Sequence, residues 1–298
     1  SLKEIPKSLV IVGSGAVGVE FGSIYKSFGT DVTILEMLPR VVPVEDEEVS
    51  KELARSYKKR GINIHTSASV TKVERTKNGI AVEFEVEGKK ERVEADKVLI
   101  AVGRRPRTED IGLDKTKIKP DRGFIQVNEW LETAEPNVYA IGDIVMGTPQ
   151  LAHVGSMQGM VAVAKIAGRA TKPLNKNRIP GCTYSHPEIG SVGLTEAKAK
   201  ETGLSLKIGR FPMRANGKAI ALGETEGMVK TIFDAKSVRL LGAHLFGAEA
   251  TELIQGFVIA MNLETTEEEL MRSIFPHPTI SETMHESVLD AFGRAIHI

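Results

Sequence analysis

The sequence predicts an α/β domain at the start of the chain, then an irregular central segment, then an α+β domain. Residues 9–35 predict the α/β domain, because a buried strand, a glycine-rich turn, a helix and a second buried strand follow one another as in a parallel βαβ unit. The chain after Cys182 predicts the α+β domain, because short strands there precede a group of helices. A length of 298 residues fits two or three such domains.

The composition is that of a globular protein with no excess of charge. Hydrophobic residues make up 41% of the chain and charged residues 26%, which argues against wholesale disorder. Lys+Arg and Asp+Glu both number 39, and a net charge of zero argues against nucleic acid as a partner. No apolar run approaches the roughly 18 residues that would span a membrane. Cys182 is the one cysteine, so an internal disulfide is excluded and a reducing compartment fits.

Apolar runs that end at glycine or charged residues define the elements predicted up to residue 103. They are strands at 9–12, 32–35 and 98–102, helices at 16–28 and 46–59, and antiparallel strands at 69–75, 80–86 and 91–94. Turns at Asn78-Gly79 and at Gly88 are expected to join the three antiparallel strands.

Charge and turn residues become frequent after residue 103, and we expect a domain boundary there. The elements expected beyond it are a strand at 138–141, a helix at 151–167, a linker at 168–180, strands at 206–211, 228–233 and 238–246, and helices at 249–261, 266–273 and 280–293. The predicted domains therefore cover residues 1–104, 105–174 and 175–298.

A Gly-x-Gly-x-x-Gly motif lies between the first strand and the first helix. Gly13 permits the tight turn, Gly15 lets a pyrophosphate approach the backbone, and Gly18 lets helix and strand pack closely. Glu36 ends the next strand, where a carboxylate binds adenosine ribose hydroxyls and repels a 2′-phosphate, so the motif predicts a Rossmann-like domain that binds NAD. A glycine-rich turn beside a solvated glutamate is the alternative. Arg40 is close enough in sequence to meet a phosphate instead.

Residues 133–143 read Thr-Ala-Glu-Pro-Asn-Val-Tyr-Ala-Ile-Gly-Asp, and the predicted strand within them ends at Gly-Asp. Ligands of α/β sheets bind beyond the carboxyl ends of strands, so Asp143 is a candidate for a ribityl or ribose hydroxyl. An aspartate that merely caps the following segment is an equal alternative on physical grounds.

These residues resemble the flavoprotein pyridine nucleotide–disulfide oxidoreductases, and within them the dihydrolipoyl dehydrogenase branch. The 133–143 segment resembles the family's second FAD contact, which implies that Asp143 binds the FAD ribityl chain. Residues 182–188, Cys-Thr-Tyr-Ser-His-Pro-Glu, with 191–196, Ser-Val-Gly-Leu-Thr-Glu, resemble the opening of the family's dimerisation domain. The resemblance implies a Rossmann-like NAD domain, part of an FAD-contacting central domain and an α+β dimerisation domain.

Further cofactor contacts are implied by the same resemblance. Leu151, Ala152 and His153 resemble the family's segment beside the flavin ring. Glu20 resembles a family glutamate near the nicotinamide, although a solvated helix residue is the alternative, and Gly103 opens the family's Gly-Arg-x-Pro segment. The chain departs from the usual family pattern at Arg107, Gln158 and Phe275.

Residues 277–282, His-Pro-Thr-Ile-Ser-Glu, resemble the family's proton-transfer signature. An imidazole titrates near neutrality and suits a thiol proton, and a carboxylate on its other nitrogen fixes the tautomer. The resemblance implies that His277 is the base and Glu282 its orienting partner, in an enzyme whose activity needs a dimer. Without the resemblance, a turn histidine and a Thr279–Glu282 capping box would explain the same residues.

Other polar residues, including His285, are expected to be structural. His65, His186, His244 and His297 have no metal-ligand spacing and are expected at the surface or hydrogen-bonded, so no metal is predicted. The acids at 267–269 are expected to begin a helix.

The resemblance implies that the complete enzyme oxidises protein-bound dihydrolipoamide through a redox disulfide and FAD, and reduces NAD. It covers the whole chain but about the second two-thirds of a family member. The family's FAD βαβ unit and its Cys-x4-Cys pair are not found in this sequence. We therefore expect a C-terminal fragment that is inactive alone. Rival readings are another reductase of the superfamily, of the glutathione or mercuric type, or a non-catalytic, self-associating NAD-binding module.

The expected partners are a second copy of the chain and the lipoyl domains of 2-oxoacid dehydrogenase complexes, with no nucleic acid and no membrane. The apolar run at 240–246 and the helix at 253–261 are expected to supply the dimer surface. No targeting segment is visible, so the expected location is the bacterial cytoplasm or, in a eukaryote, an organelle matrix.

Overall fold

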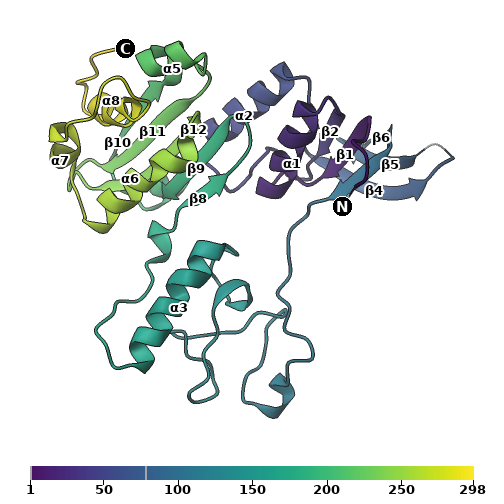
Figure 1. Cartoon of the computed structure of the whole chain (residues 1–298), viewed down its shortest axis with the longest axis horizontal. Coiled ribbons are helices and arrows are strands. Elements are labelled where there is room, and N and C mark those ends of the chain that lie inside the picture. The colour runs from purple at the N-terminus through teal and green to yellow at the C-terminus, as the bar shows by residue number, and fades with distance from the viewer. Residues whose placement is uncertain (1, 78) are drawn as a thin grey trace. The chain divides into compact units, whose positions relative to one another are not determined.

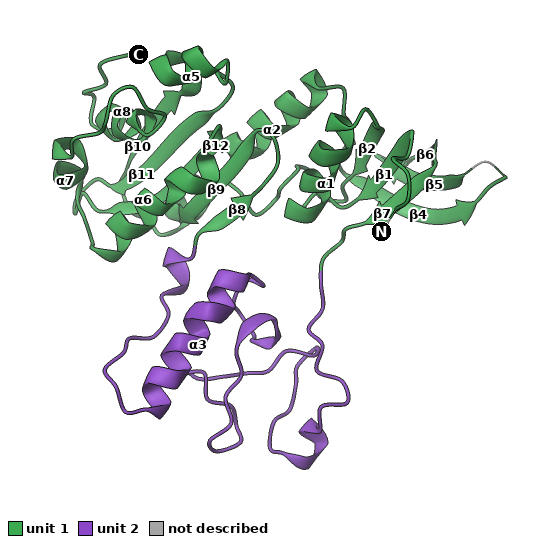
Figure 2. Ribbon diagram, in the orientation of Figure 1, with its two compact units in different colours: residues 1–103, 180–298 green, residues 104–179 purple. Residues whose placement is uncertain are grey.

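The computed structural model describes residues 2–77 and 79–298 (Figure 1). The chain forms two compact units, one of residues 1–103 with 180–298 and one of residues 104–179 (Figure 2). The first and third predicted domains thus pack into one unit, and the division into three domains stays a prediction.

The first unit opens with a parallel sheet in the order β3-β2-β1-β7. Its strands are β1 (Ser8–Val12), β2 (Asp31–Leu35), β3 (Asn63–His65) and β7 (Lys97–Ile100). Its helices are α1 (Ala16–Ser27) and α2 (Glu47–Lys59). Strands β1 and β2 are parallel neighbours, as the βαβ pattern predicted. The sequence pattern missed β3, whose three residues are too few to show a period.

An antiparallel meander follows, in the order β4-β5-β6. It consists of β4 (Ala68–Arg75), β5 (Ile80–Val86) and β6 (Lys89–Ala95), which confirms the three predicted strands. Glu87 and Gly88 both have positive φ, as a two-residue hairpin turn requires, so the predicted turn at Gly88 is present. The other predicted turn, Asn78-Gly79, includes a residue outside the described ones.

The second part of this unit is a five-stranded antiparallel sheet in the order β10-β11-β12-β9-β8. Its strands are β8 (Gly181–Thr183), β9 (Glu188–Gly193), β10 (Leu206–Pro212), β11 (Met228–Asp234) and β12 (Leu240–Gly247). Its helices are α4 (Glu196–Glu201), α5 (Gly217–Leu222), α6 (Ala250–Asn262), α7 (Glu267–Arg272) and α8 (Glu282–Ala291). Thr266 and Glu269 form a complete capping box at the start of α7, as the acids at 267–269 suggested.

The apolar run at 240–246 was expected to supply dimer surface, and that expectation is wrong. Strand β12 is the middle strand of its sheet, and Ala243, Leu245 and Phe246 are fully buried in the core of this chain. Seven of the eight residues of β12 are buried, so both faces of the strand are covered and its apolar side chains are not available to a partner.

The second unit contains α3 (Ala152–Ile166) and short 3-10 helices at Leu113–Lys115, Gly142–Ile144 and Lys176–Arg178. The strand predicted at 138–141 is not formed there. The segment makes one isolated bridge, between Glu132 and Tyr139, and otherwise runs as coil. A strand needs a neighbouring ladder for its backbone groups, and this single bridge does not provide one.

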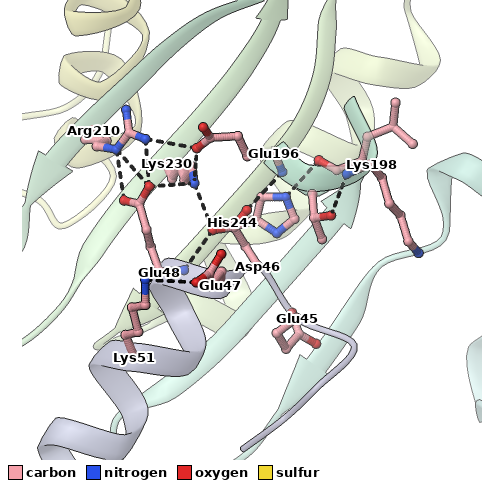
Figure 3. A network of polar contacts seen from close by, with 12 residues as sticks. Glu45, Asp46, Glu47, Glu48, Lys51, Glu196, Lys198, Arg210, Lys230 and His244 are labelled. Carbon is pink, nitrogen blue, oxygen red and sulfur yellow. Dashed lines mark hydrogen bonds and ion pairs between the residues drawn. The ribbon is translucent and has the colours of Figure 1, made fainter. Parts of the chain in front are cut away.

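A buried ion cluster joins the start of α2 to the antiparallel sheet of the same unit (Figure 3). Lys230 on β11 is 1% exposed, and its Nζ lies 2.8 Å from Asp46, 2.8 Å from Glu48 and 2.7 Å from Glu196. Burial alone would lower the pKa of this amine, but the three carboxylates outweigh burial and raise it. Lys230 therefore stays charged and fully paired.

Asp46 also fixes the backbone at two helix starts. Its Oδ1 accepts the N–H of Glu48, so it caps α2, and its Oδ2 accepts the N–H of Glu196 at 3.0 Å, at the start of α4. Arg210 on β10 binds Glu48 through Nε and Nη2 and reaches Glu196 through Nη2 at 2.9 Å. Two cations and three carboxylates thus form one connected cluster.

His244 lies next to this cluster and is buried and hydrogen-bonded, which is one of the two states predicted for it. It is 1% exposed, and burial lowers its pKa, so the ring is neutral. Its Nε2 lies 2.9 Å from the carbonyl oxygen of Leu194, while its Nδ1 has no hydrogen-bond partner among the described residues. Strand alternation alone could not show that this polar side chain points into the interior.

We expect Lys230→Met to lower the free energy of unfolding by about 3–5 kcal/mol, because the buried Asp46 and the partly buried Glu48 and Glu196 would lose their shared cation. Lys200→Met is the matched control. That lysine pairs with Glu196 but is 65% exposed, and its loss should change stability by about 0.5 kcal/mol or less. Urea unfolding of both variants measures the difference, and equal effects would contradict a structural role for the cluster.

Glu196 should make stability depend on acid. Partial burial opposes its ionisation, but hydrogen bonds from Lys200 and Lys230 outweigh burial and lower its pKa from 4.5 to about 2. The folded state therefore holds this carboxylate charged at a pH where the unfolded chain would protonate it, so its contribution is complete above pH 4.5 and falls as the pH drops towards 2. Urea unfolding across that window should show a shallower pH slope for Glu196→Gln than for the wild type; identical slopes would refute the assignment.

Candidate functional site

The glycine-rich turn between β1 and α1 has the steric requirements that the motif predicted. Gly13 has a φ of +99°, and a Cβ there would lie 2.6 Å from the carbonyl oxygen of Ala101. A Cβ at Gly18 would lie 2.0 Å from the carbonyl oxygen of Gly13, so only glycine allows the helix to approach the turn. A Cβ at Gly15 would meet nothing within 4 Å, which leaves open space at the helix start.

This open space faces the N-terminus of α1. Gly15 is the N-cap, and among the described residues no side chain hydrogen-bonds to cap the helix. The first N–H groups of a helix and its dipole attract anions, so the turn has the shape and polarity that a pyrophosphate needs.

Glu36 lies directly after β2 and is held against the glycine turn. Its Oε2 accepts hydrogen bonds from both the N–H and the hydroxyl of Ser14, each at 2.7 Å, and its Oε1 accepts the N–H of Leu38 at 2.8 Å. The side chain is 7% exposed and Ser14 is fully buried. The sequence analysis did not single out Ser14, because the motif leaves its position unspecified.

Arg40, which the sequence offered as an alternative phosphate contact, binds the backbone of its own loop. Its Nη2 donates to the carbonyl oxygen of Pro43 at 2.8 Å and lies 3.5 Å from that of Glu45. One nitrogen of the guanidinium is therefore used to close the loop between β2 and α2.

Glu20 on α1 is not a freely solvated helix residue. Its Oε1 accepts the N–H of Tyr184 at 2.8 Å, and Ser23, one turn further along the helix, accepts the N–H of His186 at 3.0 Å. Helix α1 is thus tied to the segment that follows β8, within the same unit.

The candidate FAD contacts lie in the second unit. Asp143 sits in the 3-10 helix Gly142–Ile144, with its side chain 48% exposed and its Oδ2 3.7 Å from Nη1 of Arg104. Gln158 on α3 is fully buried, and its Oε1 accepts the N–H of Gly142 at 2.7 Å. Gln158 therefore positions the Gly-Asp turn. The sequence analysis missed this role, although a single amide among the apolar residues of a helix indicates a buried hydrogen bond.

The remaining flavin-segment candidates begin the same helix. Leu151 is the N-cap of α3, and Ala152 and His153 are its first residues. Gly103, the last residue of the first unit, has a φ of +118° and open space where a Cβ would lie.

The predicted proton-transfer pair is in contact. Nδ1 of His277 lies 2.9 Å from Oε1 of Glu282, at the start of α8. The His277 side chain is 79% exposed, and its Nε2 makes no hydrogen bond within residues 2–77 and 79–298. One ring nitrogen is thus held by a carboxylate while the other faces outward.

Glu282 has a second contact, so it takes part in both of the roles considered from the sequence: orienting His277 and binding the backbone of Thr279. Its Oε2 accepts the N–H of Thr279 at 2.9 Å, which is one half of a capping box. Partial burial opposes ionisation of this carboxyl, but the bonds from Thr279 and His277 outweigh it, so its pKa lies below the usual value. Glu282 is therefore an anion that both orients His277 and closes the loop before α8.

Two further histidines in this region have structural contacts. Nε2 of His285 lies 2.9 Å from the carbonyl oxygen of Met271, and its ring stacks on Phe275 with centroids 5.1 Å apart, as expected of a structural residue. Nδ1 of His297 lies 2.7 Å from Oε1 of the buried Glu286.

The described residues contain neither a candidate metal site nor a candidate membrane-spanning helix. Within residues 2–77 and 79–298, no group of three or more His, Cys, Asp or Glu side chains could hold a metal ion. In the same part of the chain, no helix is both long enough and apolar enough to cross a membrane.

Two family profiles match the chain. Residues 1–159 match "Pyridine nucleotide-disulphide oxidoreductase", and residues 179–288 match the dimerisation domain of the same family. These matches confirm the predicted fold class, an α/β nucleotide-binding part followed by a dimerisation domain.

Curated relatives are similar along almost the whole chain. Dihydrolipoyl dehydrogenase of Rhizobium etli is 53% identical over 295 residues, and that of Zymomonas mobilis is 51% identical over 295 residues. Both alignments cover 98% of this chain, which spans 61% and 63% of the lengths of those two relatives.

Solved structures give the same result. The crystal structure of LpdA from Mycobacterium tuberculosis superposes with a TM-score of 0.89 at 28% identity, covering 96% of this chain and 62% of that protein. The HOCl-induced flavoprotein disulfide reductase RclA from Escherichia coli also has a TM-score of 0.89, at 30% identity, covering 97% of this chain and 66% of that protein. With its turn, acid and His–Glu pair in place, the chain belongs to the pyridine nucleotide–disulphide oxidoreductase family.

Proposed function

We propose that this chain supplies the NAD-binding, dimer-forming and proton-transfer parts of an enzyme that oxidises dihydrolipoamide. The observation that carries the proposal is the His277–Glu282 contact of 2.9 Å, with the outer ring nitrogen of an exposed histidine directed away from its partner. The relatives named dihydrolipoyl dehydrogenase, at 53% and 51% identity, support this dithiol over the disulfide substrates of other reductases in the superfamily.

The proposed chemistry places one proton at Nε2 of His277. Oxidation of dihydrolipoamide joins its two sulfurs and releases two electrons and two protons. His277 accepts one thiol proton, and the Glu282 carboxylate stabilises the imidazolium that results. Family members use FAD and a pyridine nucleotide, which supply the two-electron redox chemistry when bound.

Oxidation of dihydrolipoamide by thiol–disulfide exchange needs a protein disulfide that accepts its two electrons, and this chain cannot form one within itself. Exchange of a dithiol requires two cysteines, and the sequence contains Cys182 alone. We therefore propose that the chain by itself does not oxidise dihydrolipoamide. The same observation favours a second candidate, a self-associating NAD-binding module without catalysis.

The proposed nucleotide is NAD and not NADP. The anion-attracting turn at Gly15 would hold the pyrophosphate, and the Glu36 carboxylate would accept ribose hydroxyls. Arg40 uses Nη2 within its own loop, which reduces its reach towards a 2′-phosphate. An NADPH-dependent reductase of the glutathione or mercuric type would need the opposite arrangement. Glu20 is proposed to lie near the nicotinamide.

The proposed FAD contacts are Asp143 for the ribityl chain and residues 151–153 beside the flavin ring. The half-exposed carboxylate of Asp143 is fitted for a hydroxyl donor, because among the described residues its one side-chain contact is with Arg104, at 3.7 Å. Gly103 is proposed to allow close approach of a cofactor.

The match to a dimerisation domain over residues 179–288 supports a homodimer. We propose that lipoyl domains of 2-oxoacid dehydrogenase complexes are further partners, and that the protein works in a bacterial cytoplasm or an organelle matrix.

The chain should bind NADH more tightly than NADPH, because Glu36 opposes the 2′-phosphate at a cost on the order of 1–4 kcal/mol. Calorimetric titration with both nucleotides measures this preference. Glu36→Gln should bring the two dissociation constants close together. Equal affinities in the wild type would contradict the role of Glu36 and favour an NADPH-dependent reductase.

His277→Gln should lower dihydrolipoamide oxidation by roughly 10²–10⁴-fold in a protein that carries this chain together with the remaining length of its relatives. Reduction of artificial acceptors by NADH should persist, because that reaction deprotonates no thiol. Stability should change by about 0.5 kcal/mol or less, since the side chain is 79% exposed. Turnover near that of the wild type would rule out the catalytic assignment.

Glu282→Ala separates orientation from capping in the same assay. It should lower turnover by loss of the orienting charge and also lower stability by about 0.5–2 kcal/mol, because Thr279 loses the acceptor of its N–H. Glu269→Ala is the matched control, since Glu269 completes a capping box at Thr266 without touching a histidine. It should lower stability while leaving turnover unchanged.

A further inference from the structure

We infer that Ser14 is a specificity-determining residue that fixes the Glu36 carboxylate in the position where it rejects a 2′-phosphate. The inference rests on the proposed NAD site and assigns to one hydroxyl the task of keeping that site selective. The Gly-x-Gly-x-x-Gly motif allows any residue at position 14. In the folded chain, the serine at this position donates two hydrogen bonds to Glu36.

The geometry concentrates two donors on one carboxylate oxygen. Both the N–H and the hydroxyl of Ser14 lie 2.7 Å from Oε2 of Glu36, while the N–H of Leu38 lies 2.8 Å from Oε1. Bonds from neutral donors to an ionised carboxylate are short and strong. Ser14 is fully buried, so water does not compete for its hydroxyl.

The backbone of Ser14 is fixed as well. Its carbonyl oxygen accepts the N–H of Val42 at 3.0 Å, from the loop between β2 and α2. Val42 itself is 1% exposed. The hydroxyl is therefore anchored on a rigid turn and not on a mobile loop, which is what a positioning group requires.

Three donors leave the carboxylate with lone pairs for ribose hydroxyls but with little freedom to rotate. To admit a 2′-phosphate, Glu36 would have to turn away and break the bonds from Ser14. Removal of the hydroxyl leaves a single N–H on Oε2, so the carboxylate can turn more readily. Rejection of NADPH should then weaken more than binding of NADH does.

The test compares dissociation constants of NADH and NADPH for the chain with Ser14→Ala. The dissociation constant of NADPH divided by that of NADH should fall by about three- to tenfold relative to the wild type, with the NADH constant changing less than the NADPH constant. Ser14→Gly, which also lacks the hydroxyl, should give the same shift. It serves as the second variant if the alanine form does not fold.

Ser50→Ala is the matched control. Ser50 is also a buried serine, 2% exposed, and its hydroxyl donates to the carbonyl oxygen of Val41 at 2.7 Å in the same loop. Among the described residues its hydroxyl makes no hydrogen bond to Glu36, so its loss should leave the ratio of the NADPH constant to the NADH constant unchanged even if it lowers stability.

Each outcome decides between the two proposals. A wild-type preference for NADH that Glu36→Gln abolishes but Ser14→Ala and Ser14→Gly leave intact would overturn the inference and keep the proposed function. The same fall in ratio for Ser50→Ala would also overturn it, because loop stability would then explain the effect. A wild-type chain that binds neither nucleotide would overturn the proposed function and the inference together.

Discussion

The buried amine of Lys230 is the constraint on which the first unit depends. It lies within 2.8 Å of carboxylates from the start of α2 and the start of α4, and it comes from the middle of β11. A buried ammonium group without its carboxylate partners is strongly destabilising, and Lys230 is 1% exposed. The segments that carry these carboxylates must therefore pack against β11 in one arrangement. The parallel sheet and the antiparallel sheet, which are separated in sequence by the whole second unit, are thereby held in a single compact body.

The nucleotide turn depends on that arrangement through a short chain of contacts. Asp46, fixed by Lys230, ends the loop that begins after Glu36. Within the loop, Val42 donates to the carbonyl oxygen of Ser14, and Ser14 in turn binds Glu36. The ion cluster thus sets one end of the loop between β2 and α2, and Glu36, the residue proposed to select the nucleotide, lies at its other end.

Carboxylates and amides with two contacts recur at the candidate sites. Glu282 binds His277 with one oxygen and the Thr279 N–H with the other. Gln158 binds the Gly142 N–H and also the hydroxyl of Thr148. In both cases one side chain closes a loop and presents a polar group beside it, which keeps a functional residue in place without extra secondary structure.

The sequence by itself determined the βαβ order and the steric roles of Gly13 and Gly18, because each rests on residues close in the chain, whereas the pairing of His277 with Glu282 was predicted only through the family resemblance. Only the tertiary structure decided that the run at 240–246 is core, that no strand forms at 138–141, that Ser14 binds Glu36 and that Gln158 binds the N–H of Gly142. It also placed Lys230 among three carboxylates, with Asp46 184 positions away from it. Local patterns report periodicity and turn chemistry, whereas burial and pairing between distant segments exist only once the chain is folded.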